Sequence, residues 1–137
     1  MKDTIDLVFS FDTTGSMYPC ITQVRRSVQE TVKELFKWIP NLRIGIISHG
    51  DHCDGDNRIN ILNLTDDPVR ICDFIRNAPN TSGGDADECY EYVMAEARGL
   101  NWTAGKNKAL VLIGDSNPHP PGYRYGSFVN HYNWRNE

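Results

Sequence analysis

Oxygen-bearing side chains follow a short apolar run near the start of the chain. In the stretch FSFDTTGSM, Asp12, Thr14 and Ser16 stand at alternate positions directly after that run. Another acid, Asp115, directly follows the apolar run KALVLIG. Carboxylate and hydroxyl oxygens are hard ligands that suit Mg²⁺ or Mn²⁺, whereas zinc prefers nitrogen and sulfur. If the two apolar runs are neighbouring strands, these oxygens face one point and could hold such an ion.

Strands and helices alternate along the chain that positions these residues. Short apolar runs with β-branched residues predict strands over 4–11, 42–48, 58–64 and 108–114. Apolar residues that recur every three or four positions predict helices over about 18–38, 66–77 and 85–98. This alternation predicts an α/β fold with a mostly parallel sheet and helices on both faces. The functional crevice of such a sheet lies beyond the carboxyl ends of its strands, where Asp12, the 81–85 loop and Asp115 all fall.

Three expectations concern single elements. Thr65 is expected to cap the second of these helices, and the acids near residue 85 favour the start of the third. The strand over 108–114 has the most continuous apolar content, so we expect it to be the most buried strand. The segment 116–137 shows no clear element and is expected to be an irregular tail.

The composition fits one domain with a packed core. The chain has 137 residues, a hydrophobic content of 39% and a net charge of −4, and this negative charge argues against nucleic acid as a partner. No apolar run is long enough to cross a membrane and the first residues show no secretory signal, so we expect no membrane partner and a cytoplasmic location. The four cysteines lack metal-ligand spacing and are expected to be free thiols.

Two other polar groups have simpler explanations than metal binding. Asp51, Asp54 and Asp56 lie in one loop, but the loop lacks the alternating acids and final glutamate of a calcium-binding EF-hand. We therefore expect a solvated surface loop there. His49 and His52 lack a third zinc ligand at a suitable spacing and are expected to be surface or structural residues.

Three stretches of the chain resemble one known family. DTTGS resembles the DxSxS motif of the von Willebrand factor A (vWA) domain, with Thr14 in the place of the first serine. TSGGDADE resembles the glycine-rich loop of an intracellular-type subgroup with a GGD signature. LIGDSNPHPP resembles the family's strand that ends in a metal-site acid and precedes a histidine-containing turn. The order and spacing of these stretches match over almost the whole chain, and the resemblance implies a Rossmann-like vWA fold with a metal-ion-dependent adhesion site (MIDAS).

The resemblance also implies a set of site residues around Mg²⁺ or Mn²⁺. The positions that match the family's metal ligands are Asp12, Thr14, Ser16 and Asp115. In the middle loop the resemblance favours Asp85, because this residue follows the paired glycines as a threonine does elsewhere in the family. Thr81 is the alternative ligand from this loop. The candidates for lining the ligand groove are Thr13, Ser82, Gly83 and His119.

The predicted sheet is shorter than the family's sheet, which has six strands where this sequence predicts four. We therefore expect residues 1–137 to form a single vWA-like domain that lacks the last strands, either because the chain is truncated or because a partner completes it. The last predicted strand would then leave an open sheet edge through which the chain could associate.

These features predict a non-enzymatic domain that binds another protein through a divalent metal ion. An Asp or Glu of the partner would supply the last oxygen to the ion. One alternative is a Mg²⁺-dependent phosphohydrolase of the haloacid dehalogenase type, although that family needs a second acid at the position of Thr14. Another is a structural or regulatory fragment with a non-functional site, in which Asp12, Thr14 and Ser16 only cap the next helix.

Overall fold

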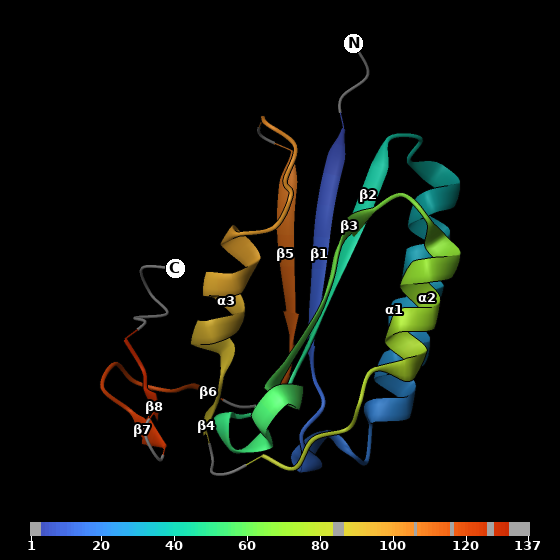
Figure 1. Cartoon of the computed structure of the whole chain (residues 1–137). Coiled ribbons are helices and arrows are strands. Elements are labelled where there is room, and N and C mark those ends of the chain that lie inside the picture. The colour runs from blue at the N-terminus through green and yellow to red at the C-terminus, as the bar shows by residue number, and fades with distance from the viewer. Residues whose placement is uncertain (1–3, 84–86, 106, 116, 126–127, 132–137) are drawn as a thin grey trace.

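The central sheet of the protein has four strands. In the computed structural model, which describes residues 4–83, 87–105, 107–115, 117–125 and 128–131, these strands lie in the order β3-β2-β1-β5. They are β1 (Ile5–Asp12), β2 (Leu42–His49), β3 (Ile59–Thr65) and β5 (Lys108–Ile113). β1 runs parallel to β2 and to β5, and β3 runs antiparallel to β2 (Figure 1). The predicted α/β fold with a mostly parallel sheet is therefore confirmed, and β1 and β5 are neighbours.

Helices cover both faces of this sheet (Figure 1). They are α1 (Ile21–Trp38), α2 (Pro68–Asn77) and α3 (Tyr90–Arg98). Successive side chains of a strand point to opposite faces, so Phe9 and Phe11 of β1 pack with α1 and α2, while Val8 packs with α3. None of the described helices combines the length and the apolar character that a bilayer-spanning helix needs. The four cysteines are free thiols.

The start of α2 differs from the prediction. Asp67, not Thr65, caps this helix, and its Oδ1 accepts hydrogen bonds from the backbone N–H groups of Val69 at 3.1 Å and Arg70 at 3.3 Å. Pro68 follows at the first helical position, where its missing N–H loses no intrahelical hydrogen bond. Aspartate and threonine both cap well, and with Asp67 as the cap the helix begins at Pro68.

The segments around α3 contain short elements that the sequence did not predict. These are β4 (Asp87–Glu88), β6 (Asn117–Pro118), β7 (Arg124–Tyr125) and β8 (Phe128–Val129). β4 pairs in parallel with β6, so α3 begins only at Tyr90, and β7 pairs with β8 in an antiparallel ladder. Two 3-10 helices, η1 (Gly15–Met17) and η2 (His52–Arg58), complete the list of helical elements that the structure describes. Part of the expected irregular tail is therefore ordered by backbone pairing.

β5 lies at an edge of the sheet and is less buried than predicted. Within the described residues it pairs with β1 only, and Val111 and Leu112 are 37% and 42% exposed. Continuous apolar content indicates a strand suited to cover on both faces, but burial also depends on neighbours that the strand's own sequence does not specify. The predicted open sheet edge is present at β5 in this part of the chain.

An ion pair joins the amino-terminal ends of β1 and β2 to the loop before β5. Asp6 is fully buried and accepts hydrogen bonds from Arg43 Nε at 3.0 Å and Arg43 Nη2 at 2.9 Å, and from the Thr103 backbone N–H. Burial acts to raise the pKa of Asp6, but the hydrogen bonds from Arg43 and Thr103 outweigh it and hold the pKa below its ordinary value. Such a carboxylate stabilises the fold above its unfolded pKa, and this contribution is lost as the pH falls through the lower folded pKa.

We predict that Asp6→Asn lowers the free energy of unfolding by about 2–4 kcal/mol at pH 7, because it breaks a buried charge pair. The difference from the wild type should narrow as the pH falls below about 4, where the unfolded aspartate becomes protonated. Urea unfolding between pH 7 and pH 2.5 measures both effects. Asp73→Asn is the matched control, because Asp73 forms an exposed pair with Arg76 at 2.8 Å; this change should cost less than about 0.5 kcal/mol. An equal loss for Asp6→Asn at both ends of the pH range would contradict the prediction.

Candidate metal site

The parallel pairing of β1 and β5 brings four of the predicted ligand residues together. The Thr14 hydroxyl donates to Asp12 Oδ1 at 2.6 Å, and Thr14 Oγ1 lies 3.2 Å from Ser16 Oγ. The Ser16 hydroxyl in turn donates to Asp115 Oδ1 at 3.0 Å. The structure therefore places four oxygen atoms in a row that begins at the end of β1 and finishes just beyond β5.

A tight turn after β1 sets the first half of this row. The Thr14 backbone N–H donates to Asp12 Oδ1 at 2.8 Å, which is a turn that aspartate side chains often form. Thr14 is extended, with φ −70° and ψ 168°, and its side chain makes no capping hydrogen bond to η1. Helix capping therefore does not explain the Thr14 hydroxyl, whose contacts are to Asp12 and Ser16.

The row of oxygens has fewer protons than contacts. Thr14 and Ser16 carry one hydroxyl proton each, and an ionised carboxylate carries none. The two protons serve the contacts to Asp12 and Asp115, so the 3.2 Å contact between the two hydroxyl oxygens has no proton between them when both acids are ionised. A cation bound to both hydroxyl oxygens would satisfy the lone pairs that face each other there.

The spacing of the row fits a small octahedral ion. Mg²⁺ binds oxygen at about 2.0–2.1 Å, which places adjacent ligand oxygens about 3.0 Å apart. The Thr14–Ser16 and Ser16–Asp115 separations are 3.2 and 3.0 Å. Ser16 and Asp115 are exposed, so the outer side of the row is open to solvent. Among the described residues no group of three or more His, Cys, Asp or Glu side chains is arranged to hold a metal ion, so hydroxyl groups would have to complete the set of ligands here.

Burial disfavours the charged form of the Asp12 carboxyl group. Its side chain is fully buried, and burial raises the pKa of Asp12 above its ordinary value, with a further rise from the charge of Asp115. Hydrogen bonds from Thr14 and from the Tyr90 hydroxyl offset only part of this rise. A bound cation would favour the charged form of Asp12, because an opposite charge lowers the pKa of an acid.

The loop that follows α2 is fixed to the same strand end. Thr81 N–H donates to the Thr13 carbonyl at 2.9 Å, and the two hydroxyl oxygens are 3.0 Å apart. Thr13 and Thr81 are only 1% and 5% exposed. Thr13 was predicted to line the ligand groove, and this is wrong, because its side chain is buried against Thr81 and the His49 carbonyl.

Asp85 and Thr81 are the two predicted metal ligands from this loop. Asp85 lies outside the described residues, and the Thr81 hydroxyl contacts the Thr13 hydroxyl at 3.0 Å. Of the other groove candidates, Ser82 is exposed and Gly83 is half-buried, and the Ser82 carbonyl accepts a hydrogen bond from Gly15 N–H at 3.2 Å. These two residues lie beside the turn that carries Thr14 and Ser16.

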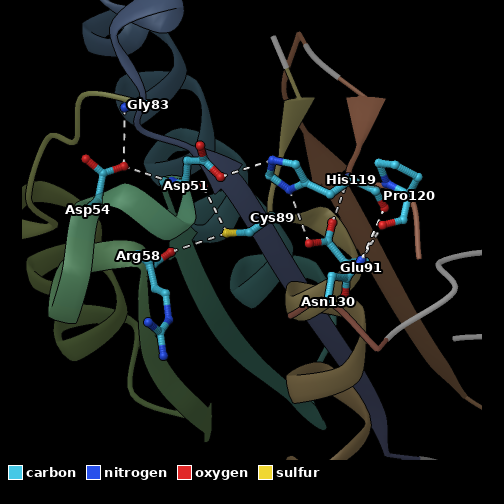
Figure 2. A network of polar contacts seen from close by, with 10 residues as sticks. Asp51, Asp54, Arg58, Gly83, Cys89, Glu91, His119, Pro120 and Asn130 are labelled. Atoms are coloured by element: carbon cyan, nitrogen blue, oxygen red, sulfur yellow. Dashed lines mark hydrogen bonds and ion pairs between the residues drawn. The ribbon is translucent and has the colours of Figure 1, made fainter. Parts of the chain in front are cut away.

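Asp54 orders this loop, a role that the sequence analysis missed. Its carboxylate accepts a hydrogen bond from the backbone N–H group of Ser82 at 2.8 Å. It also accepts hydrogen bonds from the backbone N–H groups of Gly83 at 3.3 Å and Asp51 at 2.8 Å (Figure 2). A Cβ atom at Gly50 would collide with this carboxylate. The loop was predicted to be solvated, but its Asp54 carboxylate holds the backbone of residues 82 and 83 in place; we call this set of hydrogen bonds the Asp54 clamp. The sequence signal for this role was an aspartate beside a glycine in a turn-forming stretch.

His119 does not line a groove, contrary to the prediction. Its side chain is fully buried, with Nε2 3.3 Å from Asp51 Oδ1 and Nδ1 3.3 Å from Glu91 Oε1 (Figure 2). The ring stacks on Tyr123 at 3.9 Å, and Asn130 donates to the His119 carbonyl at 3.4 Å. An imidazole held between two buried carboxylates has no open side for a ligand, so His119 joins the 117–131 segment to α3 and the Asp51 loop.

Solved structures of two bacterial pilus proteins share this fold. The vWF domain of the type V pili tip protein Mfa5 from Porphyromonas gingivalis matches with a TM-score of 0.68 and 19% identity, over 85% of this chain and 39% of that chain. The pilus adhesin SpaC from Lactobacillus rhamnosus GG matches with a TM-score of 0.70 and 18% identity, over 85% of this chain and 16% of that chain. The predicted vWA fold is therefore confirmed, and identities this low show the fold alone.

One curated protein is similar to this chain in sequence. The chain is 25% identical over 134 residues to the alpha-protein kinase vwkA of Dictyostelium discoideum, which covers 96% of this chain and 21% of that protein. The chain therefore spans about a fifth of the length of this relative. No family model matches the chain.

We predict that Asp54→Ala releases the loop at residues 81–83, because it leaves three backbone N–H groups without their acceptor. The free energy of unfolding should fall by about 1–3 kcal/mol. Amide hydrogen exchange, measured by NMR, should become at least roughly tenfold faster at Ser82 and Gly83, since one lost hydrogen bond of this strength corresponds to such a factor. Asp66→Ala, at an exposed position before α2, is the control. Unchanged exchange at Ser82 and Gly83 would show that Asp54 does not order the loop.

Proposed function

We propose that this chain is a protein-binding domain that recognises an acidic side chain of its partner through a divalent metal ion. The observation that carries the proposal is the row of four oxygens from Asp12, Thr14, Ser16 and Asp115, in which two protons serve three short contacts. Mg²⁺ is the ion that best suits these ligands and separations, with Mn²⁺ as the close alternative.

Each residue of the row would have a distinct task. Ser16 and Asp115 are exposed and would bind the ion at the surface, while Thr14 would bind it from the buried side. Asp12, which is fully buried, would accept the hydrogen bond of the Thr14 hydroxyl and offset the ion's positive charge from the buried side. Either Thr81 or Asp85 would complete the set from the neighbouring loop. The bound ion would supply a positive charge that attracts an Asp or Glu carboxylate of the partner.

The comparisons support a binding role. The similar solved structures are described as a pilus adhesin and a pilus tip protein, and adhesion is a form of protein binding. The similar kinase is about five times as long as this chain, so its name says nothing direct about this segment. A location in the cytoplasm remains part of the proposal, because the four cysteines are free thiols, which suits a reducing compartment.

Binding is also favoured over catalysis by the position of Asp12. A nucleophilic aspartate must reach the substrate, as in phosphohydrolases that form an aspartyl-phosphate. Asp12 is fully buried and accepts hydrogen bonds from Thr14 and Tyr90 on its two oxygens. Thr14 stands where such enzymes need a second acid, so we propose that the chain is not an enzyme.

We predict that MgCl₂ and MnCl₂ bind the purified chain with measurable heat in isothermal titration calorimetry. Asp115→Ala and Ser16→Ala should weaken this binding at least roughly 100-fold, because loss of a ligand exceeds the 10- to 100-fold effect of an outer-shell change. Both residues are exposed, so their variants should keep the fold. Asp66→Ala, which removes an exposed acid distant in sequence from the row, is the control for a general loss of negative charge.

The role in protein binding has a separate readout. On an array of peptides, wild-type protein in Mg²⁺ should prefer peptides with Asp or Glu over the same peptides with Asn or Gln. EDTA and Asp115→Ala should each abolish the preference. Absence of metal binding by the wild type, or equal peptide binding in Mg²⁺ and EDTA, would contradict the proposed function.

A further inference from the structure

A tyrosine from α3 holds the Asp12 carboxylate from the side opposite to Thr14. Tyr90, the first residue of α3, is 6% exposed, and its hydroxyl donates to Asp12 Oδ2 at 3.2 Å. Asp12 Oδ1 accepts the backbone and hydroxyl hydrogen bonds of Thr14. Both oxygens are therefore fixed, and the carboxylate cannot rotate without losing a hydrogen bond.

We propose that Tyr90 is a positioning residue of the metal site, which fixes Asp12 and, through Asp12, the direction of the Thr14 hydroxyl. This proposal rests on the proposed function of the site. The Thr14 hydroxyl donates its single proton to Asp12, so its lone pairs face away from that carboxylate. A cation would bind those lone pairs. If Asp12 rotated, the Thr14 hydroxyl could instead donate to Ser16, 3.2 Å away, and its proton would then point toward the ion's position.

His49 at the end of β2 and Gly114 directly after β5 fix the Tyr90 ring in this position. The ring packs edge-on against His49 of β2, with centroids 4.8 Å apart and an interplanar angle of 70°. Burial lowers the pKa of His49 to about 3, so this imidazole is neutral where it packs against Tyr90. Gly114, directly before Asp115, lies at the hydroxyl end of the ring, where a Cβ atom would collide with the Tyr90 hydroxyl.

The close contact with the Tyr90 hydroxyl explains why residue 114 is a glycine. The φ angle of Gly114 is not positive, so its backbone conformation does not require glycine. The requirement comes from space, because the end of β5 must approach the Tyr90 hydroxyl closely while Asp115 reaches Ser16. Tyr90 and Gly114 thus join β5 to the Asp12 side of the site, and the hydroxyl has one defined place beside Asp12 Oδ2.

The test compares Tyr90→Phe with Tyr92→Phe. Phenylalanine keeps the ring against His49 and removes only the hydroxyl. Tyr92 lies on the same helix with its ring 5.5 Å from the Arg58 guanidinium, away from Asp12, so Tyr92→Phe is the matched control. The affinity for MgCl₂ is measured by isothermal titration calorimetry, and the melting temperature is measured in EDTA and in excess Mg²⁺.

Tyr90→Phe should weaken Mg²⁺ binding roughly 10- to 100-fold, the usual effect of losing a group that orients a ligand. The rise in melting temperature on adding Mg²⁺ should shrink accordingly, because stabilisation by a ligand depends on its concentration relative to Kd. Tyr92→Phe should bind Mg²⁺ as the wild type does. A merely structural role would lower the melting temperature in EDTA and leave the Mg²⁺ affinity of the folded protein unchanged.

A second variant displaces the hydroxyl without removing it. Gly114→Ala should push the hydroxyl away from Asp12 and weaken Mg²⁺ binding to a similar degree. The double variant Tyr90→Phe with Gly114→Ala should bind Mg²⁺ no more weakly than Gly114→Ala alone, since both changes remove the same interaction. Additive losses would overturn the proposal, because they would mean that the two residues act independently on the ion.

The outcomes separate this inference from the proposed function. If the wild type and Tyr92→Phe bind Mg²⁺ and Tyr90→Phe binds it equally well, the role of Tyr90 is wrong and the metal site stands. If the wild type binds neither Mg²⁺ nor Mn²⁺, the proposed function is wrong and the role of Tyr90 falls with it.

Discussion

The candidate site depends on the parallel pairing of β1 with β5. This pairing runs from Asp6 opposite Lys108 to Phe11 opposite Ile113, so the carboxyl ends of the two strands finish side by side. Asp12 is the last residue of β1 and Asp115 lies two residues beyond β5, and Ser16 donates to Asp115 across 99 residues of sequence. Two negative charges are held near each other by the sheet, and burial makes one of them costly. A divalent cation is the simplest partner for such an arrangement.

Around this edge the structure combines a rigid inner side with an open outer side. Asp12 and Thr14 are buried, and their hydrogen bonds fix their orientation before any ligand arrives. Ser16 and Asp115 are exposed and face solvent. A binding site gains affinity when its ligands are already oriented, because less conformational freedom is lost on binding. The Asp54 clamp extends this order to the loop at residues 81–83, beside the same turn.

The sequence predicted the parts of the molecule that depend on local pattern. The α/β alternation and the position of Asp12 at a strand end follow from periodicity and from where each apolar run stops. The sequence-based predictions were wrong where the burial of a residue depends on segments that are distant in the sequence. The apolar content of β5 predicted a buried strand, yet β5 lies at an edge of the sheet. His119 was predicted to line a groove, yet its ring is buried between Asp51 and Glu91. Tyr90 gave no signal, because its place on a helix face resembles that of any core residue until the fold brings it to Asp12.

A crystal structure of the chain grown with MnCl₂, with anomalous diffraction recorded at the manganese edge, would show directly whether a metal ion binds at the carboxyl ends of β1 and β5. We expect one anomalous peak within coordination distance of Thr14 Oγ1 and Ser16 Oγ, with Asp115 bound directly or through water, because oxygen ligands suit Mn²⁺. A peak elsewhere, or an anomalous map with no peak at the carboxyl ends of β1 and β5 in crystals saturated with Mn²⁺, would contradict this expectation.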